Sequence, residues 1–210
     1  MTEDVRTPTA SAYDEIVDDF VRRNSVVTED FAEYRDAFVD EVRSGGRIAD
    51  LGCGPGRDAA HFHAAGLRVA GVDASRQMLR RARADGVPVV RADIRSVPLR
   101  EQSLDGIWSA ASLLHVPRED VPPTLRAWWR LLRPAGVLGL STSLGVDEGW
   151  ESCPYEPKNQ ATSASLRRWF VHHDDDALLA LLDAAGFDVI SARERVSHRR
   201  WLQVIARRHD

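Results

Sequence analysis

The residues best suited to chemistry gather in the segment ADLGCGPGRD, residues 49–58, where a glycine-rich turn follows a short apolar run. Asp50 lies two residues before Gly52, the first glycine of this turn. A carboxylate beside a phosphate site would repel the ligand, whereas it would attract an ammonium group. The turn therefore predicts a ligand that carries both a positive group and polar acceptors. An amino-acid moiety meets this description.

The spacing of the glycines argues against the common nucleotide-binding turns. A dinucleotide-binding turn has the pattern GxGxxG, but Arg57 occupies the place of its third glycine. Pro55 removes one backbone N–H donor, and Arg57-Asp58 does not supply the GK[ST] ending of a Walker A loop. An NAD-dependent oxidoreductase is accordingly a disfavoured alternative, both because of Arg57 and because of Asp50.

Two further carboxylates end the next two apolar runs, Asp73 in VAGVD and Asp93 in VVRAD. A carboxylate at the first of these positions can accept hydrogen bonds from both hydroxyls of a ribose, and Asp93 can accept from the exocyclic amine of adenine. Any one of these acids alone is more typical of a helix cap or a solvated turn. Because ligands of open α/β sheets bind at the carboxyl ends of the strands, the joint register of Asp50, Asp73 and Asp93 predicts one shared crevice.

The elements that would position these residues alternate between short strands and helices. We predict strands at 47–51, 67–73, 87–92, 104–109, 137–143, 187–192 and 201–207, and helices at 11–23, 30–43, 57–65, 75–84, 121–133 and 174–185. This rhythm predicts an α/β fold with a doubly wound, mostly parallel sheet and helices on both faces. No helix separates the last two strands, so we expect them to pair antiparallel.

The regular pattern covers most but not all of the chain. Residues 1–10 show no period and are expected to be disordered, and residues 11–210 are expected to form a single domain in which 11–43 make a helical cap. Residues 144–170 form a long stretch without clear periodicity, and a loop of that length is usually functional or disordered. We treat residues 144–173 as an insertion on the acceptor side of the domain.

Composition and charge favour a cytoplasmic protein. The 210 residues are 43% hydrophobic and 29% charged, an ordinary balance for one soluble domain. A net charge of −4 argues against a nucleic-acid partner. No apolar run approaches the roughly 20 residues that span a bilayer, and the polar, acidic N-terminus does not resemble a signal or transit peptide.

Together these motifs resemble the class I S-adenosylmethionine-dependent methyltransferases of the small-molecule type. The resemblance covers residues 11–207 and is most specific at ADLGCGPGRD, VAGVDAS, RADI, LLRPAGVL and AAGF. In that family the sheet has seven strands in the order 3-2-1-4-5-7-6, with strand 7 antiparallel. The resemblance implies S-adenosylmethionine as cofactor, S-adenosylhomocysteine as product, and methyl transfer to an O or N atom of a small-molecule acceptor by a monomer or homodimer.

The resemblance also implies which residues hold the cofactor. Asp50 and the backbone of the turn would hold the methionine part, Asp73 the ribose and Asp93 the adenine. Tyr13 would close over the cofactor, with helix packing as an equal alternative. The full implied set is Tyr13, Asp50, Gly52, Cys53, Gly54, Asp73, Ala74, Met78, Asp93, Ile94, Ser109 and Ala110.

His115 is the candidate general base, because it follows the fourth predicted strand and imidazole titrates near neutrality. An equal alternative is that its ring holds the loop by a backbone hydrogen bond. A base is needed only if the acceptor atom carries a proton. Contacts to a planar or carboxylated acceptor are expected from the insertion, although its aromatic residues are equally suited to a satellite hydrophobic cluster. The candidates are Trp150, Tyr155, Arg168, Trp169 and His172.

We expect no metal, because the acidic ligands of catechol-type enzymes are missing after the fourth strand and HHDDD at 172–176 is more typical of a helix cap. Two alternative functions stay open. The same fold and cofactor site could serve a non-methyl transfer, such as that of an aminopropyl group, or a non-catalytic binding module. The presence of all three carboxylates argues against the binding module.

Overall fold

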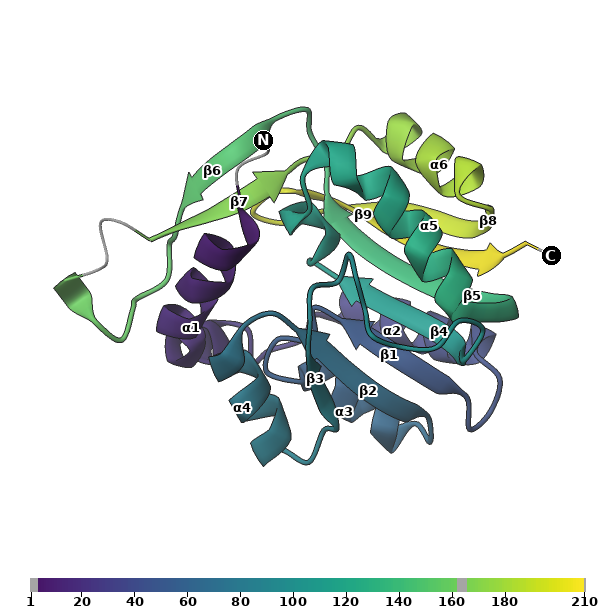
Figure 1. Cartoon of the computed structure of the whole chain (residues 1–210), viewed down its shortest axis with the longest axis horizontal. Helices are drawn as coiled ribbons and strands as arrows, with labels where there is room; N and C mark the ends of the chain where they lie inside the picture. The colour runs from purple at the N-terminus through teal and green to yellow at the C-terminus, as the bar shows by residue number, and fades with distance from the viewer. Residues whose placement is uncertain (1–3, 162–165, 210) are drawn as a thin grey trace.

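A seven-stranded sheet forms the centre of the computed structural model, which describes residues 4–161 and 166–209 (Figure 1). The strand order is β3-β2-β1-β4-β5-β9-β8. Neighbours among β1–β5 pair parallel, whereas β9 pairs antiparallel with both β5 and β8. The predicted order, 3-2-1-4-5-7-6 with the last strand antiparallel, is confirmed. The strands are β1 Arg47–Leu51, β2 Arg68–Asp73, β3 Val89–Arg91, β4 Leu104–Ala110, β5 Leu132–Ser143, β8 Phe187–Val196 and β9 Arg200–Arg208.

Helices cover both faces of this sheet because successive strand residues point to opposite sides. In β1, Ile48 belongs to the hydrophobic cluster shared with α2, α3 and α4, whereas Ala49 belongs to the cluster shared with α5 and α6. In Figure 1, α5 and α6 lie in front of the sheet. The helices are α2 Glu29–Glu41, α3 Arg57–Ala64, α4 Arg76–Ala84, α5 Val121–Leu131 and α6 Asp175–Ala184, with short 3₁₀ helices η1 Leu113–His115 and η2 Arg118–Asp120.

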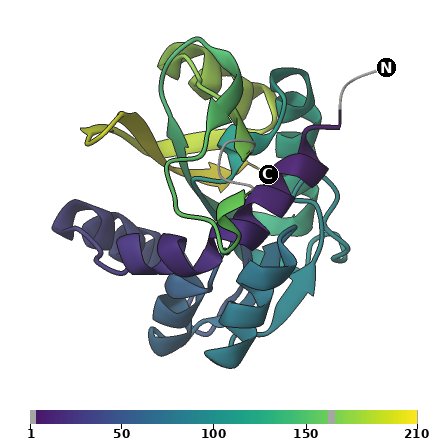
Figure 2. The ribbon, with the colours of Figure 1, turned by 90° about the vertical axis from the view of Figure 1, so that its left-hand side faces the viewer.

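The remaining elements lie beyond the carboxyl ends of the parallel strands. Helix α1, Arg6–Arg23, crosses this side of the molecule between α4 and a two-stranded antiparallel sheet of β6, Glu148–Ser152, and β7, Arg167–Val171 (Figure 2). The expectation of an irregular segment at 144–170 is therefore wrong in part. Trp150 pairs across the two strands with Trp169, and their rings pack edge to face with centroids 5.4 Å apart. Such a contact stabilises strand pairing.

The prediction of disorder over residues 1–10 is wrong for residues 6–10, which form the first turns of α1. The carboxylate of Asp4 accepts hydrogen bonds from the backbone N–H groups of Arg6 and Thr7 at 3.1 and 3.4 Å and from the Thr7 hydroxyl at 2.7 Å. It thus satisfies N–H groups that have no partner within the helix. Pro8 lies in the first turn, where a missing N–H does no harm. Residues 1–3 lie outside the described residues.

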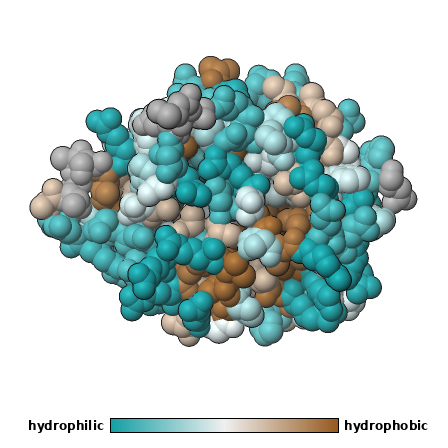
Figure 3. Space-filling view, in the orientation of Figure 1, coloured by the Kyte–Doolittle hydropathy of each residue, from teal (hydrophilic) through white to brown (hydrophobic). Residues whose placement is uncertain are grey.

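The surface in the orientation of Figure 3 is mostly hydrophilic, with a hydrophobic area over the β3 side of the sheet. Ile94, Val97 and Leu99, in the segment after β3, pack partly buried against the core cluster of α5 and α6. Over residues 4–161 and 166–209, no helix combines the length and the apolar character that crossing a membrane requires.

The segment HHDDD, residues 172–176, caps the N-terminus of α6. Asp174 accepts the backbone N–H of Ala177 at 3.0 Å, so the capping interpretation of this segment is confirmed. Directly before it, His173 is only 2% exposed, and its Nε2 has no hydrogen-bond partner in the part of the chain that the structure describes. Burial, with the nearby charges of Arg118 and His172, lowers the pKa of His173 from 6.5 to about 4.

Burial of this imidazole should make the protein less stable in mild acid. As pH falls below 6.5 the unfolded chain binds a proton at this position before the folded chain does, so stability is lost between pH 6.5 and about 4. At pH 5 the loss amounts to about 2 kcal/mol. His173→Asn should therefore flatten the acid limb of the unfolding free energy, measured in urea at each pH, whereas replacing the exposed His63 should not. An unchanged slope in His173→Asn would contradict this account.

Candidate functional site

A cavity of about 740 Å³ lies where α1 crosses the carboxyl ends of β1–β4. Its wall combines the glycine turn after β1, the ends of β2 and β3, η1, β7 and the turn between β8 and β9. The structure thus brings together eleven of the twelve residues predicted to hold a cofactor. They are Tyr13, Asp50, Gly52, Cys53, Gly54, Asp73, Ala74, Met78, Asp93, Ile94 and Ala110.

The glycine turn uses its own N–H groups inside the protein. The N–H groups of Gly52 and Cys53 donate to the carbonyl of Val72 at 2.7 and 3.0 Å, and that of Gly54 donates to Asp73 at 2.9 Å. A diphosphate is normally bound by such N–H groups. Since they are occupied here and Pro55 has none, the turn is unsuited to a diphosphate.

Two glycines of the turn allow a close approach that no other residue permits. Gly52 has φ +80°, and a Cβ there would lie 2.2 Å from the Cβ of Ser112. Gly56 has φ +88°, and a Cβ there would lie 2.9 Å from the Cβ of Ala82 in α4. Left-handed backbone and lack of space together explain why these positions carry glycine.

Asp50 presents an unmet acceptor to the cavity. The residue is 3% exposed, and its Oδ2 has no hydrogen-bond partner among residues 4–161 and 166–209. Burial raises the pKa of this carboxyl well above its ordinary value, and the negative charges of Asp58 and Asp73 add to the shift. A buried carboxylate in this state is stabilised by a cationic hydrogen-bond donor, such as a ligand ammonium group.

Asp73 is held in place at the end of β2 and keeps capacity for a ligand. One oxygen accepts the N–H of Gly54 at 2.9 Å and the other accepts the N–H of Ser75 at 2.7 Å. Burial raises the pKa of this carboxyl despite these hydrogen bonds. Each carboxylate oxygen offers about two acceptor sites, so both oxygens can accept from one further donor.

Asp93 differs from the other two acids because its charge is already paired. Arg95 donates to it through Nη2 at 2.8 Å, and Arg6 of α1 lies at 3.4 Å. Burial alone would raise the pKa of Asp93, but the hydrogen bonds and charges of Arg95 and Arg6 outweigh it and lower the pKa. Arg95 also donates to Asp120 at 2.6 Å. At the end of the cavity near β3, the negative charge of Asp93 is therefore already compensated by two arginines.

Ser109 does not line the cavity, contrary to its predicted place there. It is fully buried, and its hydroxyl lies 2.6 Å from the hydroxyl of Ser112, which donates to the carbonyl of Leu51 at 2.6 Å. Strand alternation turns Ser109 inward and Ala110 toward the cavity. Ser109 supports the glycine turn from behind.

His115 and Tyr13 form a buried hydrogen-bonded pair. The Nδ1 of His115 lies 2.5 Å from the carbonyl oxygen of Trp169, which can only accept, so Nδ1 carries the proton. Nε2 then accepts the hydroxyl of Tyr13 at 2.9 Å, and that oxygen accepts Nη1 of Arg168 at 3.1 Å. Burial lowers the pKa of His115 from 6.5 to about 3, and burial raises the pKa of Tyr13. Both rings are neutral near pH 7.

The predicted acceptor residues divide into two groups. Tyr155 and Arg168 line the cavity, whereas Trp150, Trp169 and His172 do not. Side chains alternate along β7, so Arg168 and Phe170 share the cavity face and Trp169 points away.

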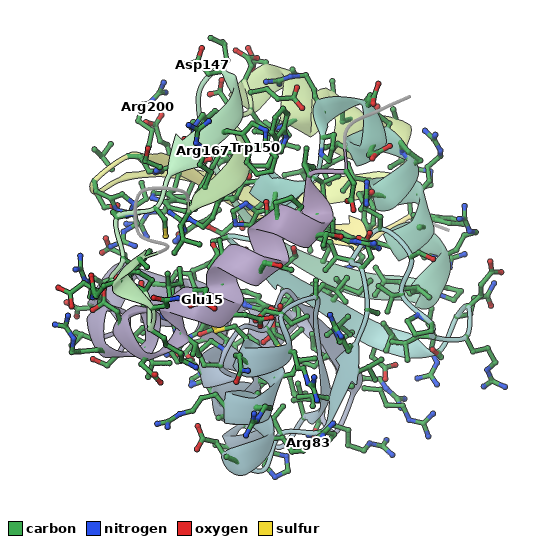
Figure 4. The ribbon with its side chains drawn as sticks, turned by 60° about the vertical axis from the view of Figure 1, so that its left-hand side comes forward. Glu15, Arg83, Asp147, Trp150, Arg167 and Arg200 are labelled. Carbon is green, nitrogen blue, oxygen red and sulfur yellow. The ribbon has the colours of Figure 1, made fainter. Side chains whose placement is uncertain are left out.

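Each of the three misplaced residues has another role in the structure. Trp150 lies with Arg167 at a separate, smaller pocket between α1 and the β6–β7 pair (Figure 4). The ring of His172 lies within hydrogen-bond distance of Ser143 and Glu151. Trp169 contributes its backbone carbonyl to the site, through His115.

Several residues around the cavity were not predicted. Asp14 on α1 accepts the hydroxyl of Ser75 at 2.6 Å and the N–H of Gln77 at 2.8 Å, which ties the helix to α4. Phe170 and Arg199 line the cavity on the side of β7 and the turn between β8 and β9. Alternation along RRWFV would have indicated Phe170 once Arg168 was chosen, but no local pattern marks Asp14 or Arg199. The described residues contain no cluster of three or more His, Cys, Asp or Glu side chains able to hold a metal ion.

The comparisons with known proteins agree on one family. Residues 48–136 match the family model described as a methyltransferase domain. The chain is 34% identical over 110 residues to methyltransferase GfsG of Streptomyces halstedii, covering 48% of this chain and 39% of that protein. It is 40% identical over 98 residues to trans-aconitate 2-methyltransferase of Escherichia coli, covering 44% and 37%.

Among solved structures, an S-adenosylmethionine-dependent methyltransferase from Mesorhizobium loti superposes with a TM-score of 0.69 at 27% identity, covering 86% of this chain and 98% of that one. The similarity to this structure therefore extends over nearly the whole fold. By contrast, the chain spans less than half the length of the two sequence relatives.

Proposed function

We propose that this chain, which belongs to the class I S-adenosylmethionine-dependent methyltransferase family, transfers the methyl group of S-adenosylmethionine to an oxygen or nitrogen atom of a small-molecule acceptor. The observation that carries the proposal is Asp50, whose buried Oδ2 lacks a partner in a cavity that also contains Asp73. The methyltransferase relatives support the reaction class.

The residues of the cavity fit this cofactor. Asp50 would bind the ammonium group of the methionine part, and Asp73 would accept the ribose hydroxyls with its two free acceptor sites. Met78 and Ile94 offer apolar contacts for the adenine near the compensated pair of Asp93 and Arg95. When bound, the cofactor supplies a methyl group on a sulfonium, which is a good leaving group.

The chain's own contribution is to orient the acceptor and exclude water, which can lower a barrier by roughly 7–11 kcal/mol. Helix α1 closes the cavity through contacts on both sides, from Asp14 to Ser75 and from Tyr13 to His115. Protonating an imidazole of pKa about 3 at pH 7 would require about 5 kcal/mol. We therefore assign His115 a positioning role, holding the Tyr13 hydroxyl at the cavity. Of the two roles that the sequence left equally open, a backbone hydrogen bond and a general base, this assignment agrees with the first.

Calorimetry tests the cofactor first. S-adenosylmethionine and S-adenosylhomocysteine should bind, and NAD should not. Incubation with S-adenosylmethionine and pools of small metabolites should then release S-adenosylhomocysteine. Absence of binding by both sulfur compounds would overturn the proposal, and formation of a different adenosine product would favour the non-methyl transfer.

Tyr13→Phe tests the hydrogen-bonded pair. Without the hydroxyl, His115 and Arg168 lose their common partner, and we expect turnover of the identified acceptor to fall about tenfold. Affinity for S-adenosylhomocysteine should change by less than about threefold, because the ring itself remains. Tyr155→Phe is the matched control, since Tyr155 also lines the cavity but does not contact His115. Equal turnover in the wild type and Tyr13→Phe would exclude a role for the hydroxyl.

A further inference from the structure

The two ends of the cavity differ in charge, since the described lining near β1–β3 has five carboxylates beside four arginines, Arg6, Arg57, Arg81 and Arg95, whereas the opposite end has arginines and no carboxylate. Among the described residues that line it, every carboxylate comes from the part of the chain between residues 50 and 93, near β1–β3. The opposite end is built by β7 and the turn between β8 and β9, and its charged side chains include Arg168 and Arg199. The five lining carboxylates are those of Asp50, Asp58, Asp73, Asp85 and Asp93.

Arg168 is a buried cation without a counter-charge. It is 5% exposed, and within residues 4–161 and 166–209 no carboxylate pairs with it. Its Nη1 donates to the hydroxyl of Tyr13 at 3.1 Å, and its Nε has no hydrogen-bond partner among those residues. The guanidinium lies 4.9 Å from the ring centroid of Phe170 and 5.3 Å from that of Tyr155. Such contacts return only part of the free energy lost when a charge leaves water.

Arg199 brings a second guanidinium to the same ring, 4.8 Å from the centroid of Phe170. Its Nη2 donates to Glu151 at 3.1 Å, but its Nη1 is buried and lacks a partner in the described part of the chain. Glu151 does not line the cavity and also contacts His172. This end therefore contains unsatisfied donors around an aromatic ring.

We propose that the cluster of Arg168, Phe170 and Arg199 binds the carboxylate of a planar, aromatic or conjugated acid, which is the methyl acceptor. A carboxylate matches the planar fork of a guanidinium, and the rings of Tyr13 and Tyr155 provide flat apolar walls beside it. Because hydrogen bonds from a guanidinium withdraw charge from the carboxylate oxygens, the carboxylate anchors the acceptor and the methyl group goes to another of its atoms. The identity of the bound acid as acceptor rests on the proposed function.

The test is calorimetry on protein saturated with S-adenosylhomocysteine. The probes are benzoate, 4-hydroxybenzoate and cinnamate, each paired with its neutral amide. At least one acid should bind with a Kd of about 1 mM or lower, and its amide should bind at least about tenfold more weakly. Arg168→Gln should weaken binding of that acid about 10- to 100-fold. Affinity for S-adenosylhomocysteine should not change.

Arg167→Gln is the matched control, because Arg167 is exposed and does not line the cavity. If Arg168→Gln does not fold, Arg199→Gln and Arg168→Lys replace it, and both should weaken binding of the acid. Binding of S-adenosylhomocysteine without binding of any acid would overturn this inference and leave the proposed function intact. Equal affinity of an acid for wild type and the arginine variants would also overturn it. Failure to bind S-adenosylhomocysteine would instead overturn the proposed function.

Discussion

Asparagine in place of Asp73 should weaken the binding of S-adenosylmethionine and S-adenosylhomocysteine about 100-fold. The substitution leaves one acceptor oxygen where there were two, although Gly54 and Ser75 both donate to this side chain. The amide N–H₂ group would then face an N–H donor of the protein. Ribose hydroxyls would lose a charged acceptor, and hydrogen bonds to charged groups contribute about 1.5–3 kcal/mol each.

Two matched asparagine variants separate this effect from a general loss of negative charge. Asp93→Asn should weaken binding much less, because Arg95 and Arg6 already compensate Asp93. Asp85→Asn should have no effect, since Asp85 is exposed at the edge of the cavity. The affinities come from calorimetry with S-adenosylhomocysteine, which avoids turnover. If Asp73→Asn bound as tightly as Asp85→Asn, Asp73 could not be the ribose acceptor.

The cofactor end of the cavity was largely predictable because it depends on local rules. The glycine turn follows β1, the acids Asp50, Asp73 and Asp93 lie in or just after the last residues of β1, β2 and β3, and parallel strands end at the same edge of a sheet. What could not be predicted is how each acid is satisfied. Asp50 keeps an unpaired oxygen, whereas Asp93 is paired with Arg6, which lies 87 residues away in sequence.

The acceptor end could be predicted only in part, because residues 144–170 show no clear periodicity although they contain a strand pair. Without the bounds of β6 and β7, the alternation along β7 has no starting point. The sequence therefore favours Trp169 and Arg168 equally as residues that face the cavity. The structure turns Arg168 into the cavity and uses Trp169 to pair with Trp150. The contribution of Arg199 depends on the turn between β8 and β9 lying against the cavity and the ring of Phe170, which no local pattern in the sequence indicates.

The packing of the sheet face behind the site depends on Trp108 in β4. Trp108 is fully buried, and the nearest of the rings around it are Tyr34, Phe38 and Phe62, at 4.7, 5.1 and 5.1 Å. A Cβ on Gly139 of the neighbouring strand would lie 2.5 Å from the indole. The ring is therefore enclosed by two helices and the neighbouring strand β5, and the surroundings cannot easily collapse into the space that it fills.

Trp108→Ala should lower the free energy of unfolding by about 3–5 kcal/mol, the range for large aromatic truncations in a core. The loss has two parts, the cavity left by the indole and the lost hydrogen bond from the indole N–H to Oδ2 of Asp58 at 3.2 Å, an oxygen that would keep only the donor of Arg57. Trp150→Ala, at the partly exposed β6–β7 pair, should cost less than about half as much. Urea unfolding measures both. Equal losses would mean that the indole of Trp108 is not enclosed as described, and the difference between the variants therefore tests the core that supports β4 and the site at its end.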